Sequence, residues 1–175
     1  MARYPAELIR KRYLFDGSEV TIRPIKADDA PIEADFVRHL SPESRYSRFM
    51  VTLNELPATK LRYLTDVDYD KHMALVATLP RDGKETEIGV ARYIVDPKGA
   101  SCEFAVAVDD AWQGSGVAGI LMATLMDTAR ARGLTSMEGI ILASNHKMLK
   151  FARQLGFTLH HDWDEPDTIQ VVRPL

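Results

Sequence analysis

Hydrophobic and polar residues alternate with a period of two over residues 19–25. Since successive side chains of a strand point to opposite faces, this alternation predicts a first β-strand. Asp28 and Pro31 then supply helix-opening residues, and apolar residues follow at helical spacing. These apolar residues are Ile32, Phe36, Val37 and Leu40. We therefore expect an amphipathic helix directly after the first strand.

Two shorter helices are expected next. Ser41 precedes Pro42, which places a hydroxyl at a helix N-cap and a proline in the first turn. This pair predicts a short helix that carries Arg45, Tyr46, Arg48 and Phe49. Arg45 and Arg48 are three positions apart, so they are expected to share a face that meets either solvent, a phosphate or an acidic acceptor. A further helix is expected over residues 57–64.

Three extended runs follow, at residues 73–79, 87–95 and 101–108. Glycine-containing segments separate them, which predicts tight turns and an antiparallel meander. The third run is mostly apolar on both faces, so it is expected to be a central strand rather than an edge.

The longest helical pattern covers residues 117–129, and Arg130, Arg132 and Gly133 then supply helix-end signals. The remaining pattern predicts a strand at 137–142, a helix at 147–155 and closing strands at 157–160 and 168–172. The order of elements indicates an α/β (α+β) protein in which the meander leads into one strand–helix–strand unit. We expect a single domain over residues 1–175, with residues 1–14 as a possible N-terminal extension.

A glycine-rich segment joins the central strand to the longest helix, from Val108 to Gly119. Glycines let bare backbone approach a ligand, and the unpaired N–H groups of a helix start favour phosphate. A tight turn with no ligand would use the same glycines. A Walker loop is excluded because Val117, rather than lysine, follows Gly116.

The spacing of Gly114, Gly116 and Gly119 also matches a dinucleotide-binding fingerprint. A Rossmann domain, however, opens with this motif and places an acidic residue at the end of a second parallel strand. Here the motif follows a β-meander, and Glu138 falls within the next predicted strand. The match is therefore interpreted as a coincidence.

The segment resembles the GNAT superfamily of N-acetyltransferases, whose signature joins a valine-ended strand to Gln/Arg-x-x-Gly-x-Gly/Ala. Val108 followed by residues 113–118 fits that signature. Residues 145–157 are similar to the family's asparagine-led helix that ends in Leu-Gly-Phe, and residues 21–25, 40–49 and 100–106 resemble bacterial Pat-type protein-lysine acetyltransferases. The resemblance implies a mixed, mostly antiparallel sheet with a splayed strand pair and helices on both faces.

The resemblance also implies an acyl-CoA donor, acetyl-CoA above all, and no metal. The pyrophosphate would meet the glycine-rich turn, and the pantetheine would lie along the exposed backbone of the central strand. The implied donor-binding residues are Val106, Ala107, Val108, Gln113, Gly114, Ser115, Gly116, Val117, Ala118, Gly119 and Asn145. Asn145 could equally serve as a helix N-cap.

In Pat-type domains a glutamate at the position of Glu103 acts as general base. Acyl transfer needs a neutral amine, so a carboxylate must remove a proton directly or through water. A structural ion pair or a solvated glutamate is the alternative for Glu103. The tyrosine that protonates the leaving thiolate in the family is replaced here by Ala152, which leaves no evident general acid.

The acceptor implied by the resemblance is a protein lysine. A small amine is the alternative acceptor, and an acyl-CoA-binding sensor without turnover is the alternative function. Two other groups carry no predicted chemistry. Cys102 alternates with Glu103 along the strand and is expected to pack inside, and the histidines and acids of residues 160–165 lack metal-ligand spacing.

Composition narrows the partners. The 22 Lys and Arg residues against 25 Asp and Glu residues give a net charge of −3, which argues against nucleic acid as a partner. The longest uncharged stretch, residues 111–126, is shorter than the ~20 apolar residues of a membrane span, so no membrane partner is expected either. The charged N-terminal residues and a single cysteine predict a cytoplasmic protein. The sequence leaves the oligomeric state open.

Overall fold

A computed structural model describes residues 2–175. Its strands are β1 (Arg10–Tyr13), β2 (Glu19–Pro24), β3 (His72–Arg81), β4 (Lys84–Val95), β5 (Ser101–Val108), β6 (Ser136–Leu142), β7 (Thr158–His161) and β8 (Thr168–Pro174). Its α-helices are α1 (Ala30–His39), α2 (Pro42–Phe49), α3 (Ala58–Thr65), α4 (Val117–Ala131) and α5 (His146–Gln154). Short 3-10 helices are η1 (Ala6–Leu8), η2 (Ala27–Asp29) and η3 (Asp110–Trp112).

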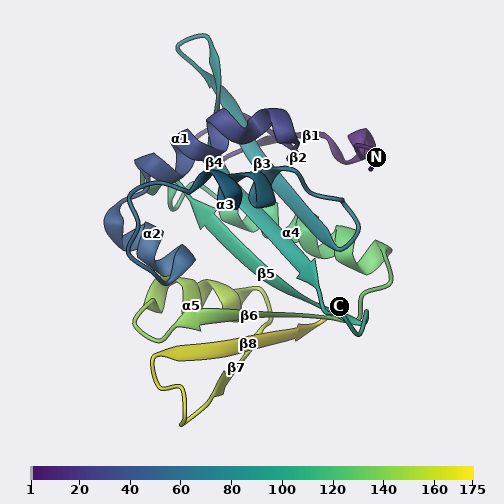
Figure 1. Cartoon of the computed structure of the whole chain (residues 1–175), viewed down its shortest axis with the longest axis vertical. Coiled ribbons are helices and arrows are strands. Elements are labelled where there is room, and N and C mark those ends of the chain that lie inside the picture. The colour runs from purple at the N-terminus through teal and green to yellow at the C-terminus, as the bar shows by residue number, and fades with distance from the viewer. Residues whose placement is uncertain (1) are drawn as a thin grey trace. The chain divides into compact units, whose positions relative to one another are not determined.

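The strands form one eight-stranded sheet in the order β1-β2-β3-β4-β5-β6-β8-β7. The pairs β1–β2, β2–β3, β6–β8 and β7–β8 are antiparallel, whereas β5 and β6 are parallel. The mixed, mostly antiparallel sheet and the central place of β5 confirm the expected fold class (Figure 1). The chain divides into two compact units: an N-terminal unit, up to Tyr93 plus Ala105–Leu125, and a C-terminal unit, Ile94–Phe104 plus Met126–Leu175.

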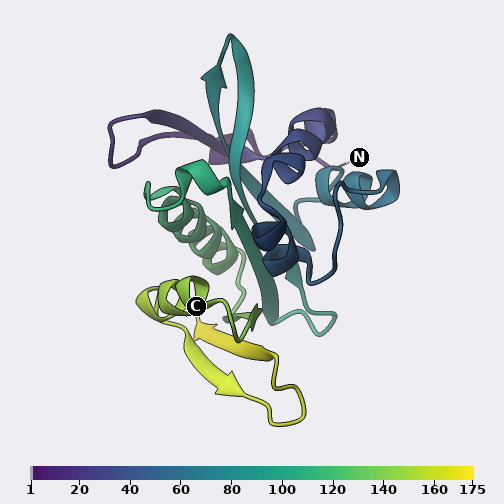
Figure 2. The same cartoon turned by 90° about the vertical axis from the view of Figure 1, so that its left-hand side faces the viewer.

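In the N-terminal unit, α1, α2 and α3 cover one face of the strands and the first part of α4 covers the other (Figure 2). The core between these layers is mostly apolar, and the central strands β3 and β4 bury successive side chains on both faces because helices cover both sides of the sheet. Fully buried members include Ile22, Leu75, Tyr93 and Leu121. The helical periodicity of the sequence thus matches the faces that the helices bury.

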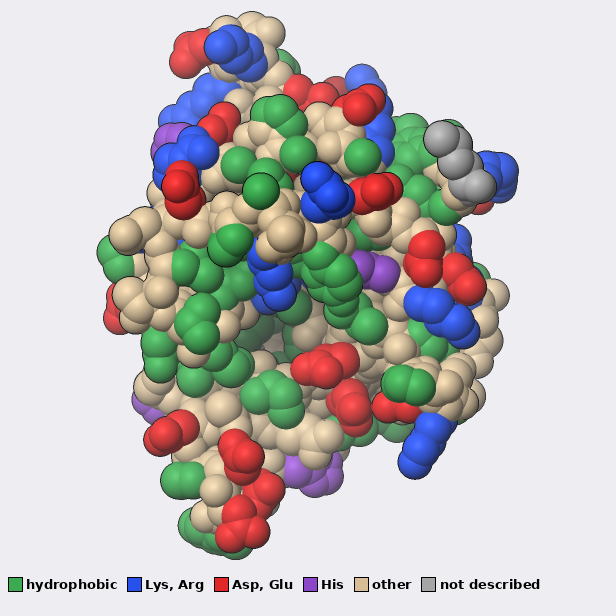
Figure 3. Space-filling view, viewed as in Figure 1, with side chains coloured by type: hydrophobic (Ala, Val, Ile, Leu, Met, Phe, Trp, Pro, Cys, Tyr) green, Lys and Arg blue, Asp and Glu red, His purple; other side chains and the backbone are tan. Residues whose placement is uncertain are grey.

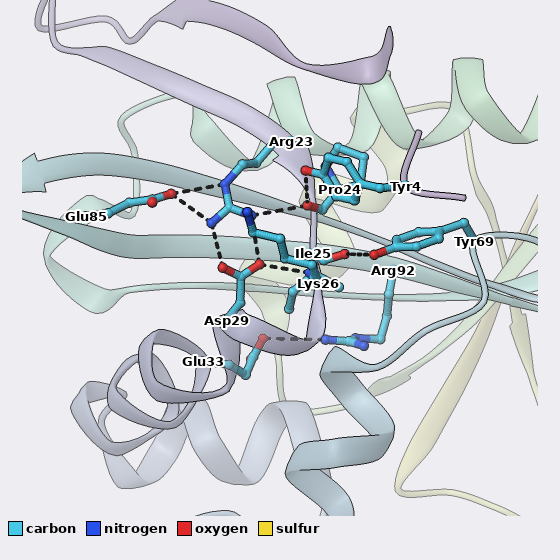
Figure 4. A network of polar contacts seen from close by, with 10 residues as sticks. All are labelled: Tyr4, Arg23, Pro24, Ile25, Lys26, Asp29, Glu33, Tyr69, Glu85 and Arg92. Carbon is cyan, nitrogen blue, oxygen red and sulfur yellow. Dashed lines mark hydrogen bonds and ion pairs between the residues drawn. The ribbon is translucent and has the colours of Figure 1, made fainter. Parts of the chain in front are cut away.

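A buried arginine fixes the start of the first helix against the sheet (Figure 4). Arg23 of β2 donates from both terminal nitrogens to the two carboxylate oxygens of Asp29, each at 2.7 Å, and from Nε to Glu85 at 3.0 Å. Burial by itself would lower the pKa of Arg23, but hydrogen bonds to these two carboxylates raise it. The guanidinium therefore stays charged and holds η2 beside β2.

The segment expected as an N-terminal extension contains a strand. β1 pairs with β2 from Arg10 opposite Ile22 to Tyr13 opposite Glu19, although every β1 side chain is exposed. Backbone pairing rather than side-chain burial makes this edge strand, so the sequence carries no alternation that could predict it. β4 likewise begins at Lys84, ahead of the predicted 87–95 run, because the β3–β4 hairpin stays paired beyond its buried part.

In the C-terminal unit, β5 and β6 share a register from Ser101 to Glu103, and β6 pairs with β8 along its whole length. The Phe104 ring lies 5.1 Å from that of Phe157, centroid to centroid. A Cβ at Gly139 would lie 2.5 Å from the Phe104 ring, so only glycine fits at that position. Close packing of two aromatic rings thus explains a glycine inside β6.

Acidic side chains gather on the β7–β8 connection (Figure 3), where Trp163 is also 90% exposed. This segment is a surface loop, as the sequence predicts. Within residues 2–175 there is no group of three or more histidine, cysteine or acidic side chains that could hold a metal ion. No helix over the same residues is long and apolar enough to span a membrane.

Candidate functional site

The glycine-rich segment forms a tight connection between β5 and α4 in the N-terminal unit. Asp109 caps η3 by accepting a hydrogen bond from the N–H of Ala111 at 2.9 Å. Gly114 and Gly116 then adopt φ angles of +80° and +96° before α4 begins. These angles lie where side chains with a Cβ are strained, so both glycines are required by the backbone path.

The turn also leaves bare backbone open to a ligand. A Cβ at Gly114 or Gly119 would meet no atom within 4 Å. The 15-residue helix α4 has no acidic side chain in its first turn, so the positive end of its dipole is not offset there. Gly116, between Gly114 and Gly119, is covered by the Phe15 ring, and the N–H of Val117 donates to Oγ of Ser115 at 3.4 Å. The uncovered backbone at Gly114 and Gly119 beside a helix start suits a phosphate or pyrophosphate.

A carboxylate next to this turn holds the second helix. Asp110 of η3 accepts hydrogen bonds from the N–H and Oγ of Ser41, each at 3.0 Å, and from Oγ of Ser44 at 2.9 Å. Burial would raise the pKa of Asp110, but these hydrogen bonds outweigh it and lower the pKa. Ser41 in turn accepts from the N–H of Ser44 at 3.1 Å, which confirms it as the N-cap of α2.

The two arginines of α2 contact other parts of this chain and are not directed towards a substrate that receives the acetyl group. Arg45 is buried and donates to the carbonyl oxygens of Leu53 at 3.0 Å and Leu40 at 2.6 Å. The expectation that Arg45 meets solvent, phosphate or an acidic acceptor is therefore wrong. Arg45 points inward, where its guanidinium finds three backbone carbonyl oxygens as hydrogen-bond partners.

Arg48 reaches a buried charged cluster that the sequence did not indicate. Burial and the charge of Arg92 lower the pKa of Arg48 to about 10. Glu33 of α1 lies 3.7 Å from Arg92 of β4, Oε2 to a terminal nitrogen (Figure 4). Arg92 also donates to the Leu64 carbonyl at 2.9 Å. The three charged residues of this cluster come from α1, α2 and β4 of the N-terminal unit.

Glu87 and His72 complete this cluster, and burial favours the neutral form of each. Both carboxylate oxygens of Glu87 are buried and without a hydrogen-bond partner among the described residues. Burial, then the charge of Glu33, raises the pKa of Glu87 well above its ordinary value. Burial and Arg92 lower the pKa of His72 to about 4, and its Nε2 lies 2.9 Å from Arg92.

A narrow crevice connects this cluster with the central strand. Its walls include Glu33, Arg48 and Arg92 and also Ala107 of β5, and it is too tight for a water molecule. The sequence gave no sign that a glutamate of α1, an arginine of α2 and an arginine of β4 would lie together. Only a polar residue at an inward strand position, such as Arg92, could have pointed to them.

Glu103 is exposed on β5, and its neighbour Cys102 is 1% exposed on the opposite face. Burial, then the charge of Glu138, raises the pKa of Cys102 to about 12, so the thiol packs and is unreactive, as expected. Glu138 lies in register with Glu103 on β6 and accepts a hydrogen bond from Gln170 at 3.3 Å. This second carboxylate beside Glu103 was not singled out from the sequence.

Asn145 caps α5, since its side-chain oxygen accepts from the N–H of Met148 at 3.2 Å. Ala152 on the same helix is 1% exposed and offers no ionisable group. The proposed donor residues from Val106 to Gly119 all belong to the N-terminal unit, whereas Glu103 and Asn145 belong to the C-terminal unit. Contact of any of them with a donor stays a prediction.

Comparison with known proteins identifies the class. The model of the acetyltransferase (GNAT) family matches residues 36–157, which is well over half of the chain. The chain therefore belongs to the GNAT family of acetyltransferases and transfers an acetyl group to an amine. Members of the family generally take that group from acetyl-CoA.

Individual relatives agree. Acetyltransferase PA5475 of Pseudomonas aeruginosa is 37% identical over 162 residues, which cover 93% of this chain and 86% of that protein. The GNAT domain of S. lividans PAT superimposes with a TM-score of 0.90 at 30% identity, covering 99% of this chain and 100% of that chain. Acetyltransferase Pat of Mycolicibacterium smegmatis is 29% identical over 141 residues, which cover 80% of this chain and 41% of that protein.

Proposed function

We propose that this protein acetylates lysine side chains of other proteins, with acetyl-CoA as donor and Glu103 as general base. The choice of acetyl-CoA as donor is supported by the glycine turn at the start of α4, where the backbone of Gly114 and Gly119 is uncovered. The acceptor half is supported by the likeness to Pat-type domains and by the 99% coverage in the superposition on the S. lividans domain. That coverage also supports residues 1–175 as one acetyltransferase domain.

The turn, the end of β5 and Asn145 each have a separate role in this proposal. The backbone of Gly114 to Gly119, flanked by Gln113, binds the donor pyrophosphate. The backbone of Val106, Ala107 and Val108 pairs with the pantetheine amides. Asn145 is held by its capping hydrogen bond and contacts the donor or orders a water molecule. When bound, the donor supplies an activated thioester.

Glu103 lies on the same strand as the pantetheine-binding residues and is exposed. In the proposal it removes the proton of the attacking lysine amine, directly or through water. The amine nitrogen forms the new bond to the acetyl carbon, and the bond from that carbon to sulfur breaks. The sulfur leaves as a thiolate without help from α5, where Ala152 has replaced the family's tyrosine.

A small amine remains the alternative acceptor. Arg45 gives no support to an acidic protein acceptor, because that side chain is buried. The part of α2 that stays exposed includes Tyr46, with 46% of its surface accessible. An acyl-CoA-binding sensor without turnover is the second alternative, and Glu103 argues against it. The expected cytoplasmic location also stays a prediction.

Mass spectrometry after incubation with acetyl-CoA tests the proposal. The protein's own lysines, a bacterial lysate and a panel of small amines are compared for the parent, Glu103→Gln and Glu138→Gln. We expect lysine acetylation that falls by ~10² to 10⁴ in Glu103→Gln and persists in Glu138→Gln, the matched carboxylate on the next strand. If Glu103→Gln keeps the parental rate, Glu103 is not the general base. If only small amines are acetylated, the proposal of a protein acceptor is wrong.

A further inference from the structure

The tip of the β1–β2 hairpin, residues 14–18, lies against the glycine turn (Figure 2). The N–H of Phe15 donates to the carbonyl of Ser115 at 3.0 Å. A Cβ at Gly116 would lie 3.0 Å from Cζ of Phe15 and 3.1 and 3.3 Å from its two Cε atoms, so the far end of the ring rests on that glycine. The hairpin tip therefore covers the middle of the turn.

The turn is also closed by hydrogen bonds of its own. The N–H of Ser115 donates to the carbonyl of Trp112 at 3.2 Å, and the N–H of Val117 donates to Oγ of Ser115 at 3.4 Å. A pyrophosphate at a helix start is bound by several free backbone N–H groups together. Two N–H groups of this turn already have partners, and the backbone of Gly116 lies under the ring. The whole turn becomes accessible to a pyrophosphate only after this arrangement opens.

Ser115 couples the hairpin tip to the start of α4. Its carbonyl accepts a hydrogen bond from Phe15, and its hydroxyl accepts one from Val117, the first residue of the helix. Movement of Phe15 away from the turn breaks the first of these bonds and uncovers Gly116 in the same step. The position of Phe15 therefore decides how much of the turn a ligand can reach.

The contact of Phe15 with the turn can break without loss of the hairpin. Phe15 is 85% exposed, so lifting its ring off the glycine adds little apolar surface to water. The tip keeps its own shape, because the N–H of Leu14 donates to Ser18 at 2.9 Å and the N–H of Gly17 donates to Leu14 at 3.0 Å. Leu14 is buried and anchors the tip to the rest of the unit.

The ring also has open space beside it. A hollow of about 350 Å³ is lined by Phe15, Asp16, Arg81 and residues 111–115, all within the N-terminal unit. A phenyl ring that leaves Gly116 can enter this hollow without displacing another side chain. The surroundings of the ring thus allow a covered and an uncovered form of the turn.

We propose that the hairpin tip gates the donor site, an inference that rests on the proposed function. With the ring on Gly116 the turn is closed to the donor, and with the ring displaced it is open. One backbone hydrogen bond and one ring contact favour the closed form by a factor of about 10, which leaves about one molecule in ten open. Because the donor binds the open form, its association rate and its affinity are both reduced by that fraction.

Stopped-flow fluorescence and titration calorimetry of CoA binding to the full chain test the gate. Phe15→Ala removes the ring and keeps the backbone of the tip. Tyr13→Ala is the matched control, since it removes another exposed aromatic ring of the same hairpin, one whose hydroxyl donates to Glu19 at 3.0 Å. We expect Phe15→Ala to bind CoA with an association rate constant about 10-fold higher, a Kd about 10-fold lower and an unchanged dissociation rate. Tyr13→Ala should bind CoA like the parent.

Failure of the gate and failure of the proposed function are distinguishable. If the parent binds no CoA, the proposed donor is wrong and the gate with it. If Phe15→Ala binds CoA with the same rates as Tyr13→Ala, the ring does not gate the turn, while the proposed function stands. Weaker binding with faster dissociation in Phe15→Ala also contradicts the gate, because the ring then holds the bound donor. Thermal unfolding of both variants shows whether a change in binding comes from a change in stability.

Discussion

Arg92 of β4 and Glu33 of α1 form an ion pair inside the N-terminal unit, 3.7 Å apart and each no more than 3% exposed (Figure 4). An ion pair at this depth persists only because each charge compensates the burial of the other. Glu87, also buried, has no such partner and is held neutral by the raised pKa of its carboxyl group. Burial raises the pKa of Glu33 as well, but the charges of Arg92 and Arg48 oppose that shift, so the charged form is favoured more at Glu33 than at Glu87.

Replacing each glutamate by glutamine should separate their roles. Glu33→Gln leaves the charge of Arg92 uncompensated and should lower the free energy of unfolding by about 3 kcal/mol. Glu87→Gln replaces a neutral group by another of equal size and should change it by less than about 1 kcal/mol at neutral pH. Urea unfolding of both variants is the measurement. Equal destabilisation would show that Glu87 is charged as well.

Glu87 should also give the folded protein a pH dependence. Above its ordinary pKa of 4.5, Glu87 loses its proton in the unfolded chain but keeps it in the folded state. The unfolded state then binds fewer protons, so stability falls as pH rises from there to the folded pKa. As pH rises above about 5, the stability of Glu87→Gln should fall less than that of the parent. Parallel pH curves would contradict a neutral Glu87.

Gly119→Glu should weaken donor binding without disturbing the fold. The position lies in the first turn of α4, with nothing within 4 Å of an added Cβ and no positive φ, so the side chain fits. A carboxylate there favours the helix start but repels a pyrophosphate. We expect at least about 10-fold weaker CoA binding by calorimetry. Gly119→Gln is the neutral control, and equal loss in both variants would point to bulk instead of charge.

Asp110→Ala should loosen the connection between η3 and α2. It removes the acceptor of three hydrogen bonds from Ser41 and Ser44, which we expect to cost about 1 kcal/mol of stability. Because the pKa of Asp110 is lowered in the folded state, this stability is present near neutral pH and is lost as pH falls through that pKa. Thermal unfolding at about pH 7 and about pH 3 should therefore show a smaller difference between variant and parent at the lower pH.

Arg45→Gln should destabilise the protein and leave the salt dependence of acetylation unchanged. Its guanidinium donates hydrogen bonds to carbonyl oxygens inside the fold and is not available to a protein that receives the acetyl group. Loss of these hydrogen bonds should lower the melting temperature by several degrees. The acetylation rate of a protein target is then compared with the parent at low and high salt, below both transitions. A changed salt dependence with unaltered stability would return Arg45 to the acceptor surface.

Local pattern determined much of this protein. The periodicity around Leu121 predicted α4, Ser41 with Pro42 predicted the start of α2, and alternation with Glu103 placed Cys102 inside. The resemblance to the family came from the signature of Val108 and residues 113–118 together with residues 145–157, and the positive φ at Gly114 and Gly116 is a requirement of the local backbone within that signature. These features depend on neighbours within a few positions of the chain, which the sequence displays directly.

Tertiary structure alone decided which distant residues meet. β1 exists because its backbone pairs with β2, and the placement of Phe15 on Gly116 follows from that pairing. The inward direction of Arg45 depends on carbonyl groups of other segments, and the neutral state of Glu87 depends on burial beside Glu33. Backbone pairing, burial and charge compensation between residues far apart in sequence have no periodic signature, so they become visible only when the chain is folded.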